Sequence, residues 1–203
     1  MSADSELTPD SPEMIWQMYE GLTGQCQHFN GLESTYRALA STWLLAAFGG
    51  VGYVLSNNVG GHAAVLSAAI GAAAALGIVL LWMLDLQVYH SLLVGAFSEQ
   101  LRLEREHRWL PQSAHQMQKA HQGQGVVPKV VWFYVASYLL MIAIAAFALG
   151  TAAETLSIVA RVLLALAVLL IAGVPVALHM RRTAHGPQLD VLAYASSTRR
   201  SDP

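Results

Sequence analysis

The sequence has little charge and a single cysteine, and each shortage excludes a class of protein. Charged residues make up 12% of the 203 residues, about half the share that is usual in soluble domains. Hydrophobic residues make up 55% and the mean hydropathy is +0.44, which indicates an integral membrane protein. Cys26 stands alone, so an internal disulfide and a multi-cysteine metal site are excluded. The net charge of −2 does not indicate nucleic-acid binding, which needs a basic surface.

The first residues lack the basic segment and apolar core of a cleavable signal peptide. Residues 1–11 are acidic and contain proline. We therefore expect a disordered tail, and a first span that itself directs insertion into the membrane.

Runs without charge predict four transmembrane helices, each near the ~20 residues that a bilayer core requires. They cover residues 38–55, 63–84, 130–149 and 156–178. Short turns at 56–61 and 150–155, the second carrying Glu154, join them in pairs. The predicted fold class is an all-α integral membrane protein with four transmembrane helices as two hairpins, an amphipathic N-terminal cytoplasmic helix and a long cytoplasmic extension of the second span. The predicted segments are 1–11, 12–37, 38–84, 85–129, 130–178 and 179–203.

The second span leads without a proline into a polar segment that ends at Pro111. Residues 63–110 therefore predict one helix of roughly 70 Å at about 1.5 Å per residue, with Gly95 as the expected bend. Apolar residues recur along its polar part at spacings of three, four or seven, which predicts one packed stripe of Tyr89, Leu93, Ala96, Leu103 and Leu110.

A helix is also predicted before the first span, with Ser11 as N-cap and Pro12 in the first turn. Its heptad places Ile15, Leu22, Phe29 and Tyr36 at one position, and Met18, Gln25, Leu32 and Leu39 three residues on. This helix packs on the protein's own cytoplasmic part, meets a partner or another subunit, or lies on the membrane surface. The residues predicted for a partner or oligomer interface are Ile15, Leu22, Phe29, Tyr36, Tyr89, Leu93 and Leu103.

No catalytic motif, phosphate-binding loop or cofactor site is present, so we expect a protein that is not an enzyme. Residues 111–129 predict a loop with two turns of helix. His107, His115 and His121 lack the spacing and the acidic partner of a metal site. On the preceding helix, Glu104 with Arg108 and Arg102 with Glu106 are interpreted as pairs on a solvated face.

The basic residues predict the topology. Ten of the eleven Lys and Arg residues fall on one side of the four spans: Arg37, the five between Arg102 and Lys129, and the four from Arg181 onward. The positive-inside rule then places both termini and the long loop in the cytoplasm. We expect a multi-pass protein of the bacterial inner membrane.

Arg161 and Asp85 are the candidate pore or ion-path residues. Arg161 is expected about two turns inside the fourth span, where it snorkels, pairs with Glu154, lines a wet cavity or binds an anion. Asp85, at the inner mouth of the second span, pairs with a cation such as Lys129 or Arg181, or forms a ring of carboxylates in an oligomer.

Two further features concern histidines and small residues. His90 and His179 are predicted near the same inner rim, where they would form a pH-sensitive cluster. Gly49, Gly52, Gly71 and Gly77 lie within the first two spans and predict close helix packing. Pro175 predicts a kink in the fourth span.

Residues 15–39, 40–84 and 85–110 together resemble the layout of SLATT-type small transmembrane effectors of bacterial nucleotide-linked antiviral systems. The resemblance covers about half of the chain and involves no diagnostic motif, and the second hairpin departs from a two-span pattern. It implies a homo-oligomeric protein that forms a pore or perturbs the membrane, gated by a cytosolic partner or a nucleotide-type signal. The alternatives are an anchor that docks a cytosolic enzyme, and a small transporter.

Overall fold

The structure is a computed structural model that describes residues 11–57, 62–120, 126–153 and 155–183. All regular elements of the described residues are helices. The N-terminal tail up to residue 10, the turn at 58–61, His121, Glu154 and the C-terminal tail from residue 184 lie outside the described residues.

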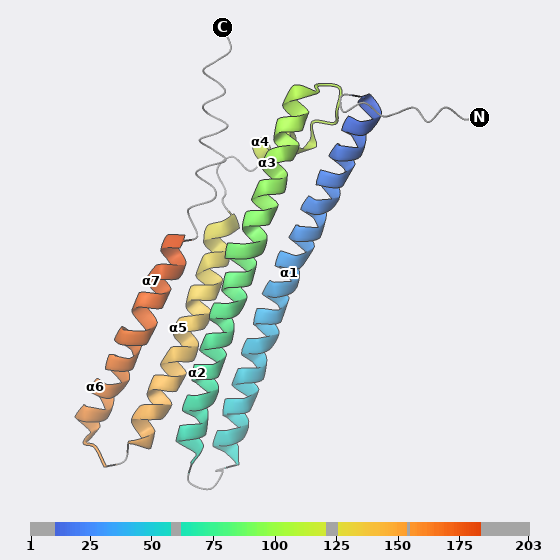
Figure 1. Cartoon of the computed structure of the whole chain (residues 1–203). Helices are drawn as coiled ribbons and strands as arrows, with labels where there is room; N and C mark the ends of the chain where they lie inside the picture. Colours follow the sequence, from blue (N-terminus) through green and yellow to red (C-terminus); the bar gives the residue numbers. More distant parts are fainter. Residues whose placement is uncertain (1–10, 58–61, 121–125, 154, 184–203) are drawn as a thin grey trace.

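Seven α-helices and two π-helical segments follow one another in the described residues (Figure 1). Their bounds are α1 Pro12–Ser56, α2 Ala63–Trp82, η2 Met83–Tyr89, α3 His90–Glu106, α4 Ser113–Ala120, α5 Val126–Ala152, α6 Ile158–Val168, η3 Leu169–Gly173 and α7 Val174–Thr183.

Four of the continuous helical stretches are long and apolar enough to cross a membrane: Pro12–Ser56, Ala63–Glu106, Val127–Ala152 and Ile158–Thr183. The prediction of an all-helical, multi-pass membrane protein is confirmed at this level. The hydropathy pattern sufficed because a span in lipid must satisfy its backbone internally, and a helix does so within one segment.

α1 begins where the sequence predicts, since the Oγ atom of Ser11 accepts a hydrogen bond from the backbone N–H of Met14 at 3.3 Å. The predicted N-terminal helix and the predicted first span form one helix, because α1 continues unbroken to Ser56. No proline follows Pro12 within it, so nothing in the chain interrupts its backbone hydrogen bonds.

The second long helix ends at Glu106, four residues before the predicted end. Within this helix the regular α-helical hydrogen bonding is interrupted at the π-helical η2. The prediction of a bend at Gly95 is wrong, since Gly95 lies inside the regular α3. The predicted two-turn helix in the following loop is confirmed as α4. α5 begins at Val126, earlier than predicted.

The fourth stretch changes its helical form just before Pro175. The backbone N–H of Val174 donates to the carbonyl of Leu169, five residues earlier, which closes the π-helical η3. Proline cannot donate to the carbonyl four residues before it, and its ring would collide with that carbonyl. A π turn relieves both problems, so the structure has a π turn where the sequence predicted a kink.

The long helices stand in a row, and contacts run from α1 to α2, from α2 to α5, and from α5 to α6 and α7 (Figure 1). α2 and α5 are the inner helices, and α5 is the more buried, with half of its most apolar window covered against 11% for the fourth stretch. α1 and α3 continue beyond the other helices as a pair. We call this pair, residues 12–37 with 85–106, the stem.

Small residues allow the closest helix contacts. A Cβ atom on Gly71 would lie 3.1 Å from the backbone nitrogen of Ala145 on α5, and one on Gly77 would lie 2.6 Å from Cε2 of Trp43 on α1. The predicted close packing is therefore confirmed at both positions. It is wrong for Gly49 and Gly52, which have nothing within 4 Å.

The buried stripe of α1 differs from the predicted heptad at every second position. Ile15 is buried, and Leu22, Phe29 and Tyr36 are partly buried, as predicted. The second buried position of the heptad lies one residue later than predicted, at Tyr19 instead of Met18. It is occupied along α1 by Tyr19, Cys26, Glu33, Ala40, Ala47 and Val54. Apolar Met18 and Leu39 remain exposed. The prediction followed hydrophobicity, whereas polar side chains such as Glu33 are buried here because α3 supplies their partners.

Candidate functional site

Asp85 is completely buried where the stem joins the other helices. Its Oδ2 atom accepts hydrogen bonds from Nε of Arg37 on α1 and from the hydroxyl of Tyr134 on α5, both at 3.0 Å. The predicted pairing of Asp85 with a cation is therefore confirmed, but the partner is Arg37 and not Lys129 or Arg181. One carboxylate joins three long helices.

The contacts continue along the stem. Nη2 of Arg37 lies 2.6 Å from Oε2 of Glu33, and Oε1 of Glu33 lies 2.9 Å from Nδ1 of His90. Glu33 is also buried, at 4% exposure. We call Tyr134, Asp85, Arg37, Glu33 and His90 the polar chain. It runs from α5 through η2 to α1 and back to α3.

The π-helical η2 brings Asp85 and His90 onto one side of the second long helix. On a regular α-helix, residues five apart point about 140° away from each other. Here the backbone N–H of His90 donates to the carbonyl of Asp85, five residues earlier, so the two residues stand nearly above one another. Both side chains therefore reach α1.

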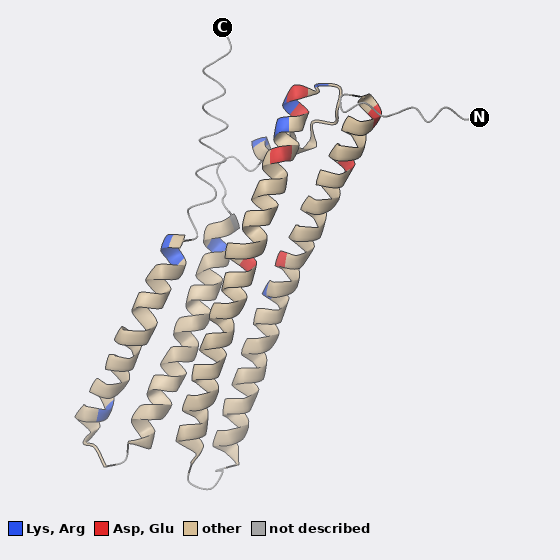
Figure 2. Cartoon of the chain, viewed as in Figure 1, with Lys and Arg blue, Asp and Glu red and all other residues tan. Residues whose placement is uncertain are grey.

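The polar chain lies about one membrane thickness from the far ends of the helices. Arg37 is 19 residues from the end of α1 at Ser56, or about 28 Å at 1.5 Å per residue. The hydrocarbon core of a bilayer is about 30 Å thick. Among the described residues, the charged ones other than Arg161 lie at this level or beyond it, on the stem, at its tip and at the near ends of α5 and α7 (Figure 2). The polar chain therefore sits where an apolar layer gives way to a polar one.

More polar contacts follow along the stem. The Tyr36 and Tyr89 rings stack with centroids 5.1 Å apart. Nε2 of Gln100 donates to Oγ1 of Thr23 at 3.2 Å, and Sγ of Cys26 lies 3.6 Å from Oε1 of Gln100. Burial raises the pKa of the Cys26 thiol. The seam between α1 and α3 is thus specified by hydrogen bonds as well as by apolar packing.

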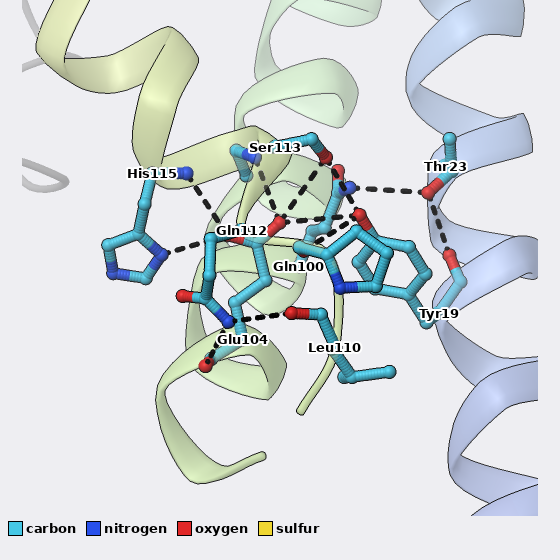
Figure 3. A network of polar contacts seen from close by, with 10 residues as sticks. Tyr19, Thr23, Gln100, Glu104, Leu110, Gln112, Ser113 and His115 are labelled. Atoms are coloured by element: carbon cyan, nitrogen blue, oxygen red, sulfur yellow. Dashed lines mark hydrogen bonds and ion pairs between the residues drawn. The ribbon is translucent and has the colours of Figure 1, made fainter. Parts of the chain in front are cut away.

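A second buried carboxylate closes the stem at its tip (Figure 3). Glu104 is completely buried. It accepts hydrogen bonds from the backbone N–H groups of Ala114 and His115, at 2.8 and 3.0 Å, and lies 2.8 Å from Nδ1 of His115. A carboxylate in this position stabilises the N-terminus of α4, whose N–H groups lack intrahelical partners.

The same carboxylate reaches α1, since the Tyr19 hydroxyl lies 3.5 Å from Oε1 of Glu104. Tyr19 also belongs to a small apolar cluster with Ile15, Leu103 and Leu110. The predicted Glu104–Arg108 pair on a solvated face is wrong, because Glu104 faces inward. The second pair is confirmed, with Nη1 of Arg102 3.4 Å from Oε1 of Glu106.

Arg161 lies nearer to a helix end than predicted. The Oγ atom of Ser157 accepts a hydrogen bond from Ala160, so α6 starts at Ile158 and Arg161 falls in its first turn. Its Nε atom donates to the carbonyl of Leu156 at 3.0 Å. Arg161 therefore lies about one turn, rather than two, from the start of this helix.

The two rim histidines do not form one cluster. His90 contacts Glu33, whereas His179 is exposed and meets the edge of Trp82, with ring centroids 6.0 Å apart. On the same side, the Arg181 guanidinium lies over the Trp132 ring at 4.7 Å.

The far ends of α1, α2 and α5 enclose a groove of about 400 Å³. Its lining is apolar except for two hydroxyl residues, and consists of Val51, Leu55, Ala64, Ser67, Ala143, Ile144, Phe147, Ala148 and Thr151. The Oγ atom of Ser67 is buried and has no hydrogen-bond partner among the described residues. The groove offers a polar solute little to bind.

Five of the seven residues predicted as an interface, Ile15, Leu22, Tyr36, Tyr89 and Leu103, pack against one another inside the chain. Ile15 packs with Leu103, and Tyr36 stacks on Tyr89. The sequence indicated Asp85 as a site residue but missed Glu33 and Tyr134. The available signal was the break in apolar spacing at Cys26 and Glu33, which lie seven residues apart on α1.

The described residues contain no group of three or more His, Cys, Asp or Glu side chains that could hold a metal ion. Comparisons of the chain with family models, with curated proteins and with solved structures found no match.

Proposed function

We propose that the chain is a homo-oligomeric protein of the bacterial inner membrane that conducts ions or permeabilises the bilayer when its stem rearranges. In this proposal the four long helices form two membrane hairpins, and the stem and both termini face the cytoplasm. The positions of Arg37, Lys129, Arg181 and Arg182 at or beyond the level of the polar chain support this orientation under the positive-inside rule.

The observation that carries the proposal is the polar chain itself. Two unbroken helices leave the apolar layer as the stem, and Asp85 ties both of them to α5 through Arg37 and Tyr134. Asp85 is fully buried, and a buried charge that loses its partners is costly. We therefore expect movement of the stem to disturb the contact with α5.

In this proposal Asp85 holds the stem to α5 through its contacts with Arg37 and Tyr134. A ring of Asp85 carboxylates that lines a pore would require its pair with Arg37 to open first, since the side chain is fully buried in the single chain. Arg161, at the opposite end, stays a candidate ion-path residue. The role in antiviral defence and the nucleotide-type signal depend on the resemblance of layout alone and remain predictions.

A reversible crosslink across the stem tests the proposal. Gln100→Cys places a second thiol opposite Cys26, whose Sγ lies 3.6 Å from Oε1 of Gln100. We expect ion flux in proteoliposomes to fall at least tenfold after oxidation and to recover after reduction. Gln100→Ser is the matched control, with no response to either treatment. Flux that is equal in oxidised and reduced Gln100→Cys would contradict the proposal.

An anchor for a cytosolic protein is the second candidate. Trp16 and Met18, near the tip of the stem, are 39% and 49% exposed, and exposed large apolar residues are typical of docking surfaces. The native mass in mild detergent distinguishes the two. A closed ring of subunits supports the pore, whereas a single chain with no flux supports the anchor.

A further inference from the structure

With Glu33 and Asp85 both ionised, the polar chain holds unequal numbers of positive and negative charges unless His90 is protonated. Glu33 and Asp85 are 4% and 0% exposed and share one guanidinium, that of Arg37. With a neutral His90 the chain carries a net negative charge, and with a protonated His90 the two carboxylates face two cations. A buried charge without a partner is costly, so the state of His90 decides whether this layer of the stem is balanced.

We infer that protonation of His90 sets the closure of the stem, and hence that the cytoplasmic proton concentration is a gating signal. This inference rests on the proposed function and adds its regulation. Imidazole is the side chain whose charge ordinarily changes near neutral pH. The stem is closed when His90 carries the second proton, and it loosens as pH rises and the proton leaves.

The groups that face His90 come from three helices. On α1 they are Glu33, in direct contact, and Arg37, which contacts Glu33. On the second long helix Asp85 shares Arg37, and Tyr89 is stacked on Tyr36. On α5 Tyr134 donates to Asp85. The contacts of Asp85 and Tyr134 reach His90 through Arg37 and Glu33, so a change in the His90 charge affects the whole polar chain.

His115 offers a matched comparison, because it too contacts a buried carboxylate. Its Nδ1 atom lies 2.8 Å from Glu104, but Glu104 already accepts two backbone N–H groups. Glu104 thus keeps its hydrogen bonds when His115 is neutral. Glu33 has only Arg37, which it shares, and His90 among the partners that the described residues show. The pH response is therefore assigned to His90 rather than to His115.

The distance between α1 and α3 tests the inference directly. Spin labels at Asn30→Cys and Ser91→Cys, two exposed positions on the two stem helices, are introduced in a Cys26→Ser background. The labelled protein is diluted with unlabelled protein in liposomes, and the distance distribution is measured by double electron–electron resonance at pH 5.5 and 8.5.

We expect the ratio of separated to closed stems to be about tenfold higher at pH 8.5, because a charge-assisted hydrogen bond is roughly twice as strong as a neutral one. His90→Gln should give the separated distribution at both pH values, and His115→Gln should keep the response of the parent. Glu33→Gln is a second variant for the same layer and should also remove the response.

A distance distribution of the parent protein that is identical at both pH values would overturn the inference. So would a response that survives in His90→Gln, or that His115→Gln removes. The distance reports on the stem without any flux measurement. A pH-dependent stem in liposomes that show no flux would therefore support this inference and contradict the proposed function, whereas pH-independent distances in conducting liposomes would do the reverse.

Discussion

Single residues in this protein act through contacts that polarity alone does not reveal. Glu104 and Glu99 lie five residues apart on α3, yet Glu104 is fully buried and the Glu99 side chain is 56% exposed. The first accepts the N–H groups of another helix, and the second pairs with Arg102 in water. An exposed pair contributes about 0–1 kcal/mol, whereas an unsatisfied buried group costs more.

Glu104→Gln should therefore weaken the stem tip, because the amide keeps the shape but loses the charge that stabilises the start of α4. A loss of about 2 kcal/mol corresponds to a fall of roughly 4–8 °C in melting temperature for a chain of this size. Thermal unfolding in detergent measures it. Glu99→Gln is the matched control and should stay within about 1 °C, and equal shifts for the two variants would refute the assignment.

Glycine positions give a second contrast at this scale. A Cβ atom on Gly77 would lie 2.6 Å from Cε2 of Trp43, whose Nε1 donates to the carbonyl of Ala74 at 3.2 Å. Gly77→Ala must displace the indole and should lower the melting temperature by several degrees, an overpacking cost of about 1–3 kcal/mol. Gly52→Ala, with nothing within 4 Å, should have no effect or raise it. A neutral Gly77→Ala would show that the two helices are not in close contact.

At the scale of helices, the π-helical η2 sets the register of the stem. It behaves as one extra residue in an α-helix, and it aligns Asp85 with His90 on the side that meets α1.

Deletion of Gln87, which is exposed and lies inside η2, should accordingly be tolerated. Removing one residue leaves Asp85 and His90 four apart on a regular α-helix, which again puts them on one face. Deletion of Gly95 in α3 should instead turn Gln100 and Glu104 about 100° away from α1. We expect the melting temperature to fall by less than about 4 °C for the first and by more than about 10 °C for the second. The opposite order would contradict this role of η2.

The helices were more predictable than the contacts between them. Hydropathy located the four long apolar stretches, and Ser11 and Pro12 located the start of α1, because these signals depend on neighbouring residues. Asp85 was recognised as unusual, but its partner Arg37 lies 48 positions away. Burial of Glu33 and Glu104 could not be predicted from one helix, since each also contacts a partner on another helix, His90 for Glu33 and the backbone of α4 for Glu104.

At the scale of the whole molecule, an open row of helices gives α5 a special place. It contacts α2 on one side and α6 and α7 on the other, while α1 and the fourth stretch stand at the edges (Figure 1). A signal from the stem can reach the second hairpin through α5, and also through the contact of Gln87 in η2 with Thr183 of α7. Tyr134 is the α5 residue of the polar chain, and Tyr138, one turn further, donates to the carbonyl of Ala172 in η3 at 2.8 Å.

Coupling between the stem and α5 is the central claim, and hydrogen exchange of α5 measures it most directly. Gln100→Cys is compared in its oxidised and reduced forms, in liposomes, for the amides of residues 130–138. We predict slower exchange when the stem is locked, and no difference between the two forms once Tyr134→Phe removes the hydroxyl that reaches Asp85. Exchange in α5 that is the same in the locked and unlocked stem, with Tyr134 intact, would contradict the account.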